Sequence, residues 1–555
     1  MVRAGAFRGI LCGLLLTAPF LLCAQTAPGI HFVRFTDKAH TPYTLDHPEA
    51  YLSQRALDRR ARQHIPLDTL DLPVDPAYVR ALLAAGPFEL LSISKWSNAV
   101  TIRSADDDAV QALARLPFVA SVRMLHDGHV RPLRRMKFPD EAKSYTAAYG
   151  DALRQIAMMN GHLLQQVGGA RGEGLLIGIL DSGFDRADVL PAFEALRARN
   201  GIVLTRDIVQ PDGNVYTAHG HGRSVLSLMA GHVNGVLEGT APAAEYVLVR
   251  TENADSESIV EEDNWVVGAE LCDSIGCDVL NTSLGYTTFD DSTQDHTYAE
   301  MDGRTTRISI AAGIASRKGM IPVNSAGNSG NSEWHYISAP ADAFGILAVG
   351  AVDGDRAVAD FSSRGPSADG RVKPEVSAMG KGTMGLDLDG TGLVPINGTS
   401  FSSPLVAGLT ACLWQLHRDR SNTEIMDAIR RSASRYADPD NDIGYGIPDF
   451  WRAHLLLGGR DLTGLINAQV LGVMPVPFST FLDIELFTGA SPTLDLELFD
   501  VAGRSVWRSS TVVEPRTYVR IRLQNEVLAG LRPGAYVLDV RVGEAHLTQR
   551  IVKAG

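Results

Sequence analysis

The sequence predicts an α/β protein whose central domain, residues 149–457, has a mostly parallel β-sheet between helical layers. The first observation is a set of short apolar runs separated by helical segments: Leu175–Leu180, Tyr246–Val249, Asp278–Ser283, Met320–Ser325 and Ile346–Val352. These runs are continuously apolar, which is typical of strands buried on both faces of a parallel sheet. The second observation is that the pattern differs on either side of this region. We therefore expect one folded domain before it and one after it.

Residues 26–135 are predicted to form a small α+β domain. One helix-like run, Asp107–Leu116, lies among four strand-like runs: His31–Phe35, Phe88–Ile93, Ala99–Ile102 and Val119–Met124. The stretch from Arg131 to Lys143 is polar and basic, so we expect residues 136–148 to form an exposed linker to the central domain.

Residues 470–555 are predicted to form a β-sandwich. The helical patterns stop at Gly458-Gly459, and four later segments alternate apolar and polar residues: Phe481–Phe487, Thr493–Phe499, Tyr518–Leu523 and Ala535–Val542. Alternation of this kind is typical of strands that have one buried and one exposed face.

Residues 1–25 have the layout of a secretory signal peptide. Two arginines precede an apolar run from Ile10 to Cys23, and Ala24 offers a small residue for cleavage. The run is short for a transmembrane helix, and no later stretch is long and apolar enough to span a bilayer. Lipoprotein processing at Cys23 is the alternative, and Leu22 disfavours it because a small residue is normally needed there. We expect an exported mature protein without a transmembrane segment.

The charge balance disfavours one class of partner. The chain has 51 basic and 64 acidic residues, a formal net charge of -13. An acidic protein of this kind is not expected to bind nucleic acid as its main partner.

Three cysteines remain after the predicted signal peptide: Cys272, Cys277 and Cys412. In an exported protein, a disulfide between Cys272 and Cys277 would leave Cys412 as a free buried thiol. The alternative is that all three are small buried hydrophobes. Neither pattern predicts a metal site or a cysteine nucleophile.

The central domain contains three segments with distinctive chemistry. The first, Ile177-Gly-Ile-Leu-Asp181, is an apolar strand that ends on an acid. The carboxyl ends of strands line the ligand crevice in open α/β sheets. The second, His219-Gly-His221-Gly, opens a run of small and apolar residues to Gly231, which predicts a buried helix with an imidazole at its start. The glycines beside His221 predict close approach of another backbone.

The third segment, Asn397-Gly-Thr-Ser400, leads into a predicted helix that extends to Leu416. Pro404 is expected in the first helical turn, where proline is tolerated. Ser400 is then at or just before the helix N-terminus, where free N–H groups and the helix dipole stabilise a developing anion. Taken alone, each segment also has an ordinary structural explanation: a turn aspartate, a structural histidine or a serine N-cap.

Together, the three segments supply what nucleophilic serine chemistry needs: a hydroxyl, a base and a carboxylate that orients the base. Their order along the chain is Asp, His, Ser, unlike that of α/β-hydrolases or chymotrypsin. Leu180-Asp181-Ser-Gly183, His221-Gly with Met229-Ala-Gly231, and Gly398-Thr-Ser400-Phe-Ser-Ser-Pro404 resemble the motifs of the subtilisin-like serine proteases. The resemblance covers roughly Tyr149 to Ala453. It implies a subtilisin-like three-layer domain with the triad Asp181, His221 and Ser400.

The histidine motif departs from the family pattern. The family usually has Thr-His after His-Gly, whereas this chain has Arg223-Ser224, which alters the expected surface on the substrate side. His219 is a rival for the base. The family's spacing to the glycine that closes the helix favours His221.

Two more segments resemble parts of the family's machinery. Asn324-Ser-Ala-Gly-Asn328 resembles the segment that carries the oxyanion asparagine, which implies that Asn328 and the Ser400 backbone N–H stabilise the oxyanion. Thr282-Ser283-Leu284-Gly285 resembles the substrate-binding strand. This implies that Ser283, Leu284 and Gly285 pair with extended peptide backbone and form one wall of the primary specificity pocket.

The flanking domains fit an exported zymogen. Propeptides of the family assist folding and inhibit the enzyme, and residues 26–135 suit that role. The C-terminal part resembles sorting domains of the type IX secretion system of Gram-negative bacteria through Met474-Pro-Val-Pro-Phe478, Leu498-Phe-Asp-Val-Ala-Gly-Arg504, Leu531-Arg-Pro-Gly-Ala-Tyr536 and Arg550-Ile-Val-Lys553. This implies export through the periplasm to the cell surface or the exterior, with the type IX machinery as a partner. The alternative is a sandwich that binds carbohydrate or protein.

The sequence thus predicts a secreted serine endopeptidase that cleaves proteins or peptides through an acyl-enzyme. No cofactor is required for this chemistry. Many relatives bind structural calcium, but Asp438-Pro-Asp-Asn-Asp442 lacks a recognisable site spacing, so no metal ligand is assigned. One rival is a serine esterase or amidase on another fold, against which the triad order and the Ser283-Leu-Gly segment argue. The other is a surface adhesin on an inactive protease scaffold, against which the four catalytic positions argue.

Overall fold

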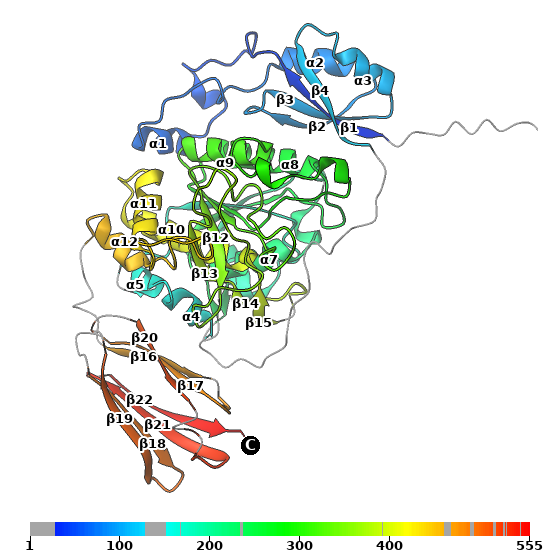
Figure 1. Cartoon of the computed structure of the whole chain (residues 1–555). Coiled ribbons are helices and arrows are strands. Elements are labelled where there is room, and N and C mark those ends of the chain that lie inside the picture. Colours follow the sequence, from blue (N-terminus) through cyan, green and yellow to red (C-terminus); the bar gives the residue numbers. More distant parts are fainter. Residues whose placement is uncertain are drawn as a thin grey trace, which may run out of the picture.

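The computed structural model describes residues 28–127, 151–459 and 468–554, apart from residues 167, 212, 234–236, 391, 475, 489–492, 514, 516–517, 525–527, 529 and 544. The predicted signal peptide and linker lie outside the described residues. The described residues form an N-terminal unit, a large central domain and a strand-rich C-terminal domain (Figure 1). No helix in this part of the chain has the length and apolar character needed to cross a membrane.

The N-terminal unit is an antiparallel four-stranded sheet covered by helices. Its strand order is β2-β3-β1-β4, with β1 (Gly29–Phe35), β2 (Glu89–Ser94), β3 (Ala99–Ser104) and β4 (Val119–His126). Helices α2 (Pro76–Ala84) and α3 (Asp107–Leu113) share a buried cluster with β1 and β3. The predicted α+β class is confirmed. Between β1 and α2 the chain also forms α1 (Gln54–Arg62), which lacks the apolar stripe that would have revealed it.

The central domain is built on a seven-stranded parallel sheet with strand order β13-β12-β11-β10-β5-β9-β6. The strands are β5 (Leu176–Asp181), β6 (Ile202–Asp207), β9 (Glu245–Arg250), β10 (Val279–Thr282), β11 (Ile321–Ser325), β12 (Leu347–Val352) and β13 (Val376–Met379). All five predicted runs are strands of this sheet. The two unpredicted strands, β6 and β13, are its edges: β6 is partly exposed and β13 is only four residues long.

Helices cover both faces of the sheet, as the continuous apolar pattern predicts. Ile177 and Ile179 of β5 belong to the core that contains α7 (His221–Ala230) and α10 (Thr399–Leu416). Leu176 and Leu180 point to the other face, where α8 (Val260–Ile275) and α9 (Arg307–Arg317) pack. The three-layer architecture is therefore confirmed.

Further short elements complete the central domain. They are α4 (Asp151–Ala157), α5 (Gly161–Gln166), α6 (Glu194–Ala198), α11 (Asn422–Ser432), α12 (Phe450–Leu456), the pair β7 (His232–Val233) and β8 (Leu237–Glu238), and the hairpin of β14 (Lys381–Leu386) and β15 (Leu393–Asn397). The hairpin returns the chain directly to the start of α10.

The C-terminal domain is a sandwich of two antiparallel sheets. One contains β16 (Gln469–Met474), β17 (Leu482–Phe487) and β20 (Tyr518–Leu523), and the other contains β19 (Ser505–Val512), β18 (Thr493–Asp500), β21 (Gly534–Val542) and β22 (Ala545–Lys553). Ile484 of the first sheet and Leu496 and Leu538 of the second belong to one buried cluster. The predicted sandwich is confirmed, although β16, β19 and β22 were not expected.

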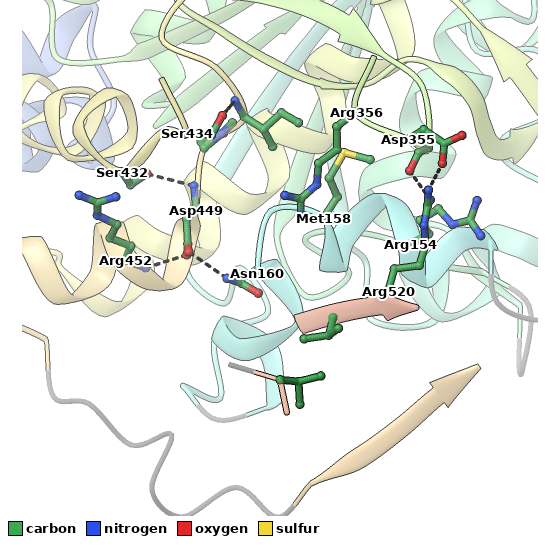
Figure 2. Close-up of a pocket in the computed structure, with 15 residues that line it drawn as sticks. Arg154, Met158, Asn160, Asp355, Arg356, Ser432, Ser434, Asp449, Arg452 and Arg520 are labelled. Carbon is green, nitrogen blue, oxygen red and sulfur yellow. Dashed lines mark hydrogen bonds and ion pairs between the residues drawn. The ribbon is translucent and has the colours of Figure 1, made fainter. Parts of the chain in front are cut away.

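A cavity of about 640 Å³ lies between the central and C-terminal domains (Figure 2). Its lining includes Arg154, Arg356 and Arg452 from the central domain and Arg520 from β20, which pairs with Asp355 across the junction. None of the predicted site residues lines it.

Candidate active site

The predicted site residues gather at the carboxyl ends of three adjacent strands. Asp181 is the last residue of β5, Ser283 directly follows β10, and Asn328 lies just beyond β11. From β5 the chain adds β6 and β9 on one side of the sheet, and then β10 to β13 on the other. The strand order therefore reverses between β5 and β10, which is where open α/β sheets place their binding crevice.

The His221 imidazole contacts the Asp181 carboxylate directly. Nδ1 of His221 lies 2.8 Å from Oδ1 of Asp181. The same oxygen accepts the Ser182 backbone N–H at 2.8 Å and the Ser182 hydroxyl at 3.2 Å. Asp181 is fully buried and His221 is 3% exposed. The carboxylate is thus fixed in place, and with Nδ1 engaged the ring presents Nε2 on its opposite side.

Glycines permit this contact. A Cβ on Gly222 would lie 2.5 Å from the carbonyl oxygen of Gly183 and 2.8 Å from Cβ of Asp181. On the other side of His221, a Cβ on Gly220 would lie 2.3 Å from the carbonyl oxygen of Leu388. The close backbone approach predicted from these two glycines is confirmed, and it brings α7 against the turn after β5.

His219, the rival base, contacts Ser182. Its Nδ1 lies 3.1 Å from the Ser182 hydroxyl and accepts the backbone N–H of His221 at 3.3 Å. Burial, together with the neighbouring His221, lowers the pKa of His219. The Ser182 hydroxyl therefore links His219 to the carboxylate that His221 contacts directly.

Ser400 lies in the first turn of α10 and is joined to the segment after β10. Its hydroxyl donates to the Ser283 carbonyl at 3.1 Å, and the Ser283 hydroxyl donates to the Ser400 carbonyl at 2.8 Å. Nearby, the rings of His221 and Phe401 have centroids 5.7 Å apart. The first turns of α7 and α10 thus meet beside the serine.

The position predicted for Pro404 was wrong. Because α10 begins at Thr399, Pro404 lies inside the helix and not in its first turn. Proline has no N–H, so it leaves the carbonyl four residues earlier, that of Ser400, without its helical donor. The Ser283 hydroxyl occupies that carbonyl, so the helix defect forms the link between the serine and the predicted substrate strand.

Asn328 is bound to the start of α10. Its Oδ1 accepts the backbone N–H and the hydroxyl of Thr399, each at 2.9 Å. Its Nδ2 lies 3.7 Å from where a Cβ on Gly398 would be, and Gly398 has a φ of 145°, a value that favours glycine. The amide donor of Asn328 and the N-terminal N–H groups of α10 are thus held together.

The remaining predicted residues extend this edge. Ser283 is 3% exposed and Leu284 is 5% exposed, and Asn324 donates its side-chain N–H to the Leu284 carbonyl at 3.3 Å. A Cβ on Gly285 would lie 2.1 Å from the Ser338 hydroxyl oxygen. The segment Ser283–Gly285 is therefore held by neighbours on both sides.

Comparison with known protein families identifies the central domain. Residues 172–446 match the "Subtilase family", and residues 30–140 match the "Peptidase S8 propeptide domain, Bacteroidota". Residues 172–446 belong to the subtilase family. The central domain is therefore a subtilisin-like serine peptidase domain, preceded by a domain of the propeptide type.

Relatives show the same relationship. The subtilisin-like protease SBT6.1 of Arabidopsis thaliana is 28% identical over 290 residues, which cover 50% of this chain and 26% of that protein. The membrane-bound transcription factor site-1 protease of Mus musculus is 26% identical over 357 residues, covering 61% of this chain and 31% of that protein. Subtilisin BL of Lederbergia lenta is 28% identical over 268 residues, 48% of this chain and 86% of that protein.

The chain thus spans about a quarter to a third of the length of the first two relatives. Among solved structures, the prenylagaramide maturation protease PagA aligns with a TM-score of 0.41 and 21% identity over 54% of this chain and 99% of that one.

The unusual Arg223 of the subtilase domain joins three backbone segments. It is fully buried, and its guanidinium donates to the carbonyls of Asp185 and Asp387, each at 2.9 Å. It also contacts the Asp185 carboxylate at 3.1 Å. The departure from the usual histidine motif therefore ties α7 to the turn after β5 and to the loop after β14.

Two contacting residues were missed by sequence reasoning. Ser182 contacts the Asp181 carboxylate, and Thr399 holds the Asn328 side chain. Both are hydroxyl residues directly next to a predicted triad residue in a motif bounded by glycine. That adjacency was the available signal.

The described residues also contain three cysteines and two acidic clusters. Cys272, Cys277 and Cys412 are all free buried thiols in the structure. Among the described residues, Glu252, Glu257 and Glu261 form a group whose carboxylate oxygens lie within 4.8 Å of one another. Glu261, in the first turn of α8, accepts the backbone N–H of Asn253 at 2.7 Å and so also holds the loop before that helix.

The acidic stretch Asp438–Asp442 is paired with arginines. Asp440 lies 2.9 Å from Arg435, and Asp442 lies 3.0 Å from Arg364. These acids serve as ion-pair partners, and we assign no metal to them.

Proposed function

We propose that the protein is an exported serine endopeptidase, made as a zymogen, whose triad is Asp181, His221 and Ser400. The observation that best supports this is the 2.8 Å contact between His221 Nδ1 and Asp181 Oδ1, next to the first turn of α10. A buried carboxylate in that position holds the imidazole in one tautomer and stabilises its protonated form.

In the proposed reaction, the Ser400 oxygen attacks the scissile carbonyl carbon while His221 Nε2 takes the hydroxyl proton. The carbon–nitrogen bond then breaks, and His221 gives the proton to the leaving amine. A water molecule repeats the sequence on the acyl-enzyme and releases the acid and the free serine. Every step uses groups of the chain and water, so no cofactor is required. A bound structural calcium ion, for which we assign no ligands, would stabilise the fold without taking part in the reaction.

The oxyanion is proposed to lie between Asn328 Nδ2 and the backbone N–H of Ser400. Asn328 Oδ1 is occupied by Thr399 at 2.9 Å, which leaves its amide N–H groups to donate elsewhere. The N-terminus of α10 adds the positive end of the helix dipole. Preorganised donors of this kind stabilise charge that appears only in the transition state.

Ser283, Leu284 and Gly285 are proposed to pair with extended substrate backbone. They follow β10 at the carboxyl edge, and Ser283 is hydrogen-bonded to Ser400 in both directions. Such pairing favours proteins and peptides over small esters as substrates.

The flanking domains are proposed to serve maturation and export. The N-terminal unit would act as the propeptide, which fits the family that residues 30–140 match. The C-terminal sandwich would direct passage from the periplasm across the outer membrane through the type IX machinery, which its short motifs support. Truncation after residue 465 should then leave specific activity unchanged and strand the protein in the periplasm. Normal export with loss of binding to a polymeric substrate would identify a binding module instead.

The triad assignment is tested by active-site labelling. A fluorophosphonate probe should label the processed protein at Ser400, and the Ser400→Ala variant should neither be labelled nor cleave casein. Ser402→Ala, a hydroxyl loss in the same buried helix turn, is the matched control and should keep both properties. Cleavage of a small ester without cleavage of casein would point to an esterase. Absence of labelling and of both activities in the processed protein would point to an inactive scaffold.

A further inference from the structure

Residues 47–72, within the segment between β1 and α2, lie outside the core of the N-terminal unit. They contain α1, and we call them the basic arm because α1 has four arginines and one acid. Among the described residues, the buried cluster of the N-terminal unit includes none from this arm. Figure 1 shows α1 set apart from the unit's sheet, beside α9 and α11 of the subtilase domain. Consistently, Gln63 donates to the Gly319 carbonyl at 2.8 Å and accepts the Asn422 backbone N–H at 2.9 Å.

Two arginines of α1 are inserted into the subtilase domain. Arg59 is fully buried, and its guanidinium lies 2.6 Å from Oδ1 of Asp273 and 3.2 Å from the carbonyl of Lys318. Arg60 is 2% exposed and donates to both carboxylate oxygens of Asp273, at 2.8 and 2.9 Å. Lys95, from the turn after β2, adds a third cation at 3.1 Å. Within the described chain, the ion pairs of Asp273 all come from the N-terminal unit.

The charge of Asp273 would be unfavourable at its position in α8 if the N-terminal unit were absent. Asp273 lies in the last turn of α8, which contains no basic residue, so its charge faces the negative end of the helix dipole. Burial alone would raise its pKa, but Lys95, Arg60 and Arg59 together lower it well below the usual range. A carboxylate at the negative end of a helix is expected only where other charges offset the unfavourable interaction. Here the basic arm and Lys95 supply those charges.

The backbone at this place is also shaped around the arm. Gly276 directly follows α8, and Gly319 lies two residues after α9; their φ values are 92° and 91°. A Cβ on Gly276 would lie 2.7 Å from the backbone nitrogen of Ala56, and one on Gly319 would lie 2.8 Å from Nε2 of Gln63. The arm therefore contacts the ends of both helices, at the amino edge of the sheet.

We propose that this amino edge is a docking surface for the basic arm. We further propose that the buried arginines of the arm, together with the turn after β2, set how long that unit stays bound once the chain between the two is cut. Arg59 and Asp273 are both fully buried, so their hydrogen bonds break before water can replace them. Loss of a partner from a buried, hydrogen-bonded charge pair typically acts on the dissociation rate. The turn after β2 adds a second buried contact, because the Glu270 carboxylate of α8 accepts the Ser94 hydroxyl at 2.6 Å and the Trp96 backbone N–H at 2.9 Å.

The test uses the full chain with Ser400→Ala and a recognition sequence for a site-specific protease placed in residues 136–148. After cutting, the release of the N-terminal fragment on dilution is followed by gel filtration and by fluorescence of a labelled fragment. The double variant Arg59→Met with Arg60→Met should release the fragment at least about a hundredfold faster than the parent. Arg62→Met is the matched control, because Arg62 is on the same helix, 37% exposed and 3.9 Å from Asp278, and its release rate should stay within about threefold.

Asp273→Asn probes the same contact from the other side, and it decides the question if the double variant does not fold. It keeps the shape and removes the charge, and release should become about tenfold faster. An unchanged release rate in Asp273→Asn would overturn the proposal, as would equal acceleration by Arg62→Met. Because Ser400→Ala is present throughout, the outcome does not depend on the triad assignment.

Discussion

The two edges of the central sheet each hold a buried aspartate, and the two acids have different surroundings. At the carboxyl edge, the Asp181 carboxylate directly contacts a titratable group, the His221 imidazole, at 2.8 Å. At the amino edge, Asp273 faces the permanently charged Arg59 and Arg60 together with Lys95. A carboxylate beside an imidazole can support proton transfer. A carboxylate surrounded by permanently charged groups instead contributes ion pairs that join the two domains. We therefore expect substitutions at the carboxyl edge to change rate and those at the amino edge to change stability.

The largest effect is expected at His221, the proposed base of the triad. His221→Ala should lower kcat about 10⁶-fold, because loss of the base disables the triad as a unit. His219→Ala should mainly alter substrate access, since His219 reaches the carboxylate only through the Ser182 hydroxyl. Peptide hydrolysis by both purified variants is the measurement. Loss of activity in His219→Ala with activity kept in His221→Ala would reverse the assignment.

The next effect concerns the amino edge. Asp273→Ala leaves Arg59, Arg60 and Lys95 without their shared anion, and loss of one partner from a buried ion pair costs about 3–5 kcal/mol of unfolding free energy. Asp427→Ala on α11 is the control, because its pair with Arg431 is half exposed and such pairs contribute about 0–1 kcal/mol. Urea unfolding of the uncut Ser400→Ala chain measures both. Equal destabilisation by the two substitutions would contradict the contrast between the edges.

A smaller effect is expected at the proposed oxyanion site. Asn328→Asp keeps an acceptor for Thr399 but replaces the amide donor, so kcat should fall about 10²–10³-fold with the melting temperature nearly unchanged. Steady-state kinetics with a peptide substrate, alongside thermal unfolding, separate the two readouts. A kcat within threefold of the parent would remove Asn328 from the oxyanion site.

The smallest effect is a pH dependence at the far end of α10. Burial, with His454 at 2.9 Å from it, lowers the pKa of His417 to about 4. Because the unfolded chain binds this proton near pH 6.5, His417 favours the folded state fully above pH 6.5, and that contribution is lost as pH falls toward 4. We expect about 2 kcal/mol to disappear across that interval. His417→Gln should reduce the loss in urea titrations at pH 7.5 and 4.5, and an identical loss in the variant would exclude His417 as its source.

Much of the carboxyl edge could be predicted from the sequence because its residues lie in short local motifs. Asp181 ends a continuously apolar strand, and Ser400 opens a helix within a box bounded by glycine. The prediction for Pro404 failed because the helix begins earlier than proline rules suggest, and a hydroxyl from another segment replaces the missing hydrogen bond. The assignments of catalytic roles stay predictions until the variants are measured.

The amino edge could not be predicted in the same way. Helix α1 is rich in arginine and reads as an exposed polar segment, yet Arg59 is fully buried. Its partner, Asp273, is more than two hundred positions away in the chain, and nothing in either segment alone indicates the other. Pairing of charges across long sequence separations leaves no periodicity, so only the fold reveals it.

Helix α7 has a further consequence for how activity is lost. All ten of its residues, from His221 to Ala230, are buried, so the helix has no solvent-facing side. Amides in such an element exchange with deuterium only when the whole domain opens, because no local opening exposes them. The imidazole at its start should therefore keep its place as long as the domain is folded. In rising denaturant, inactivation should coincide with global unfolding, and the α7 amides should be among the last to take up deuterium.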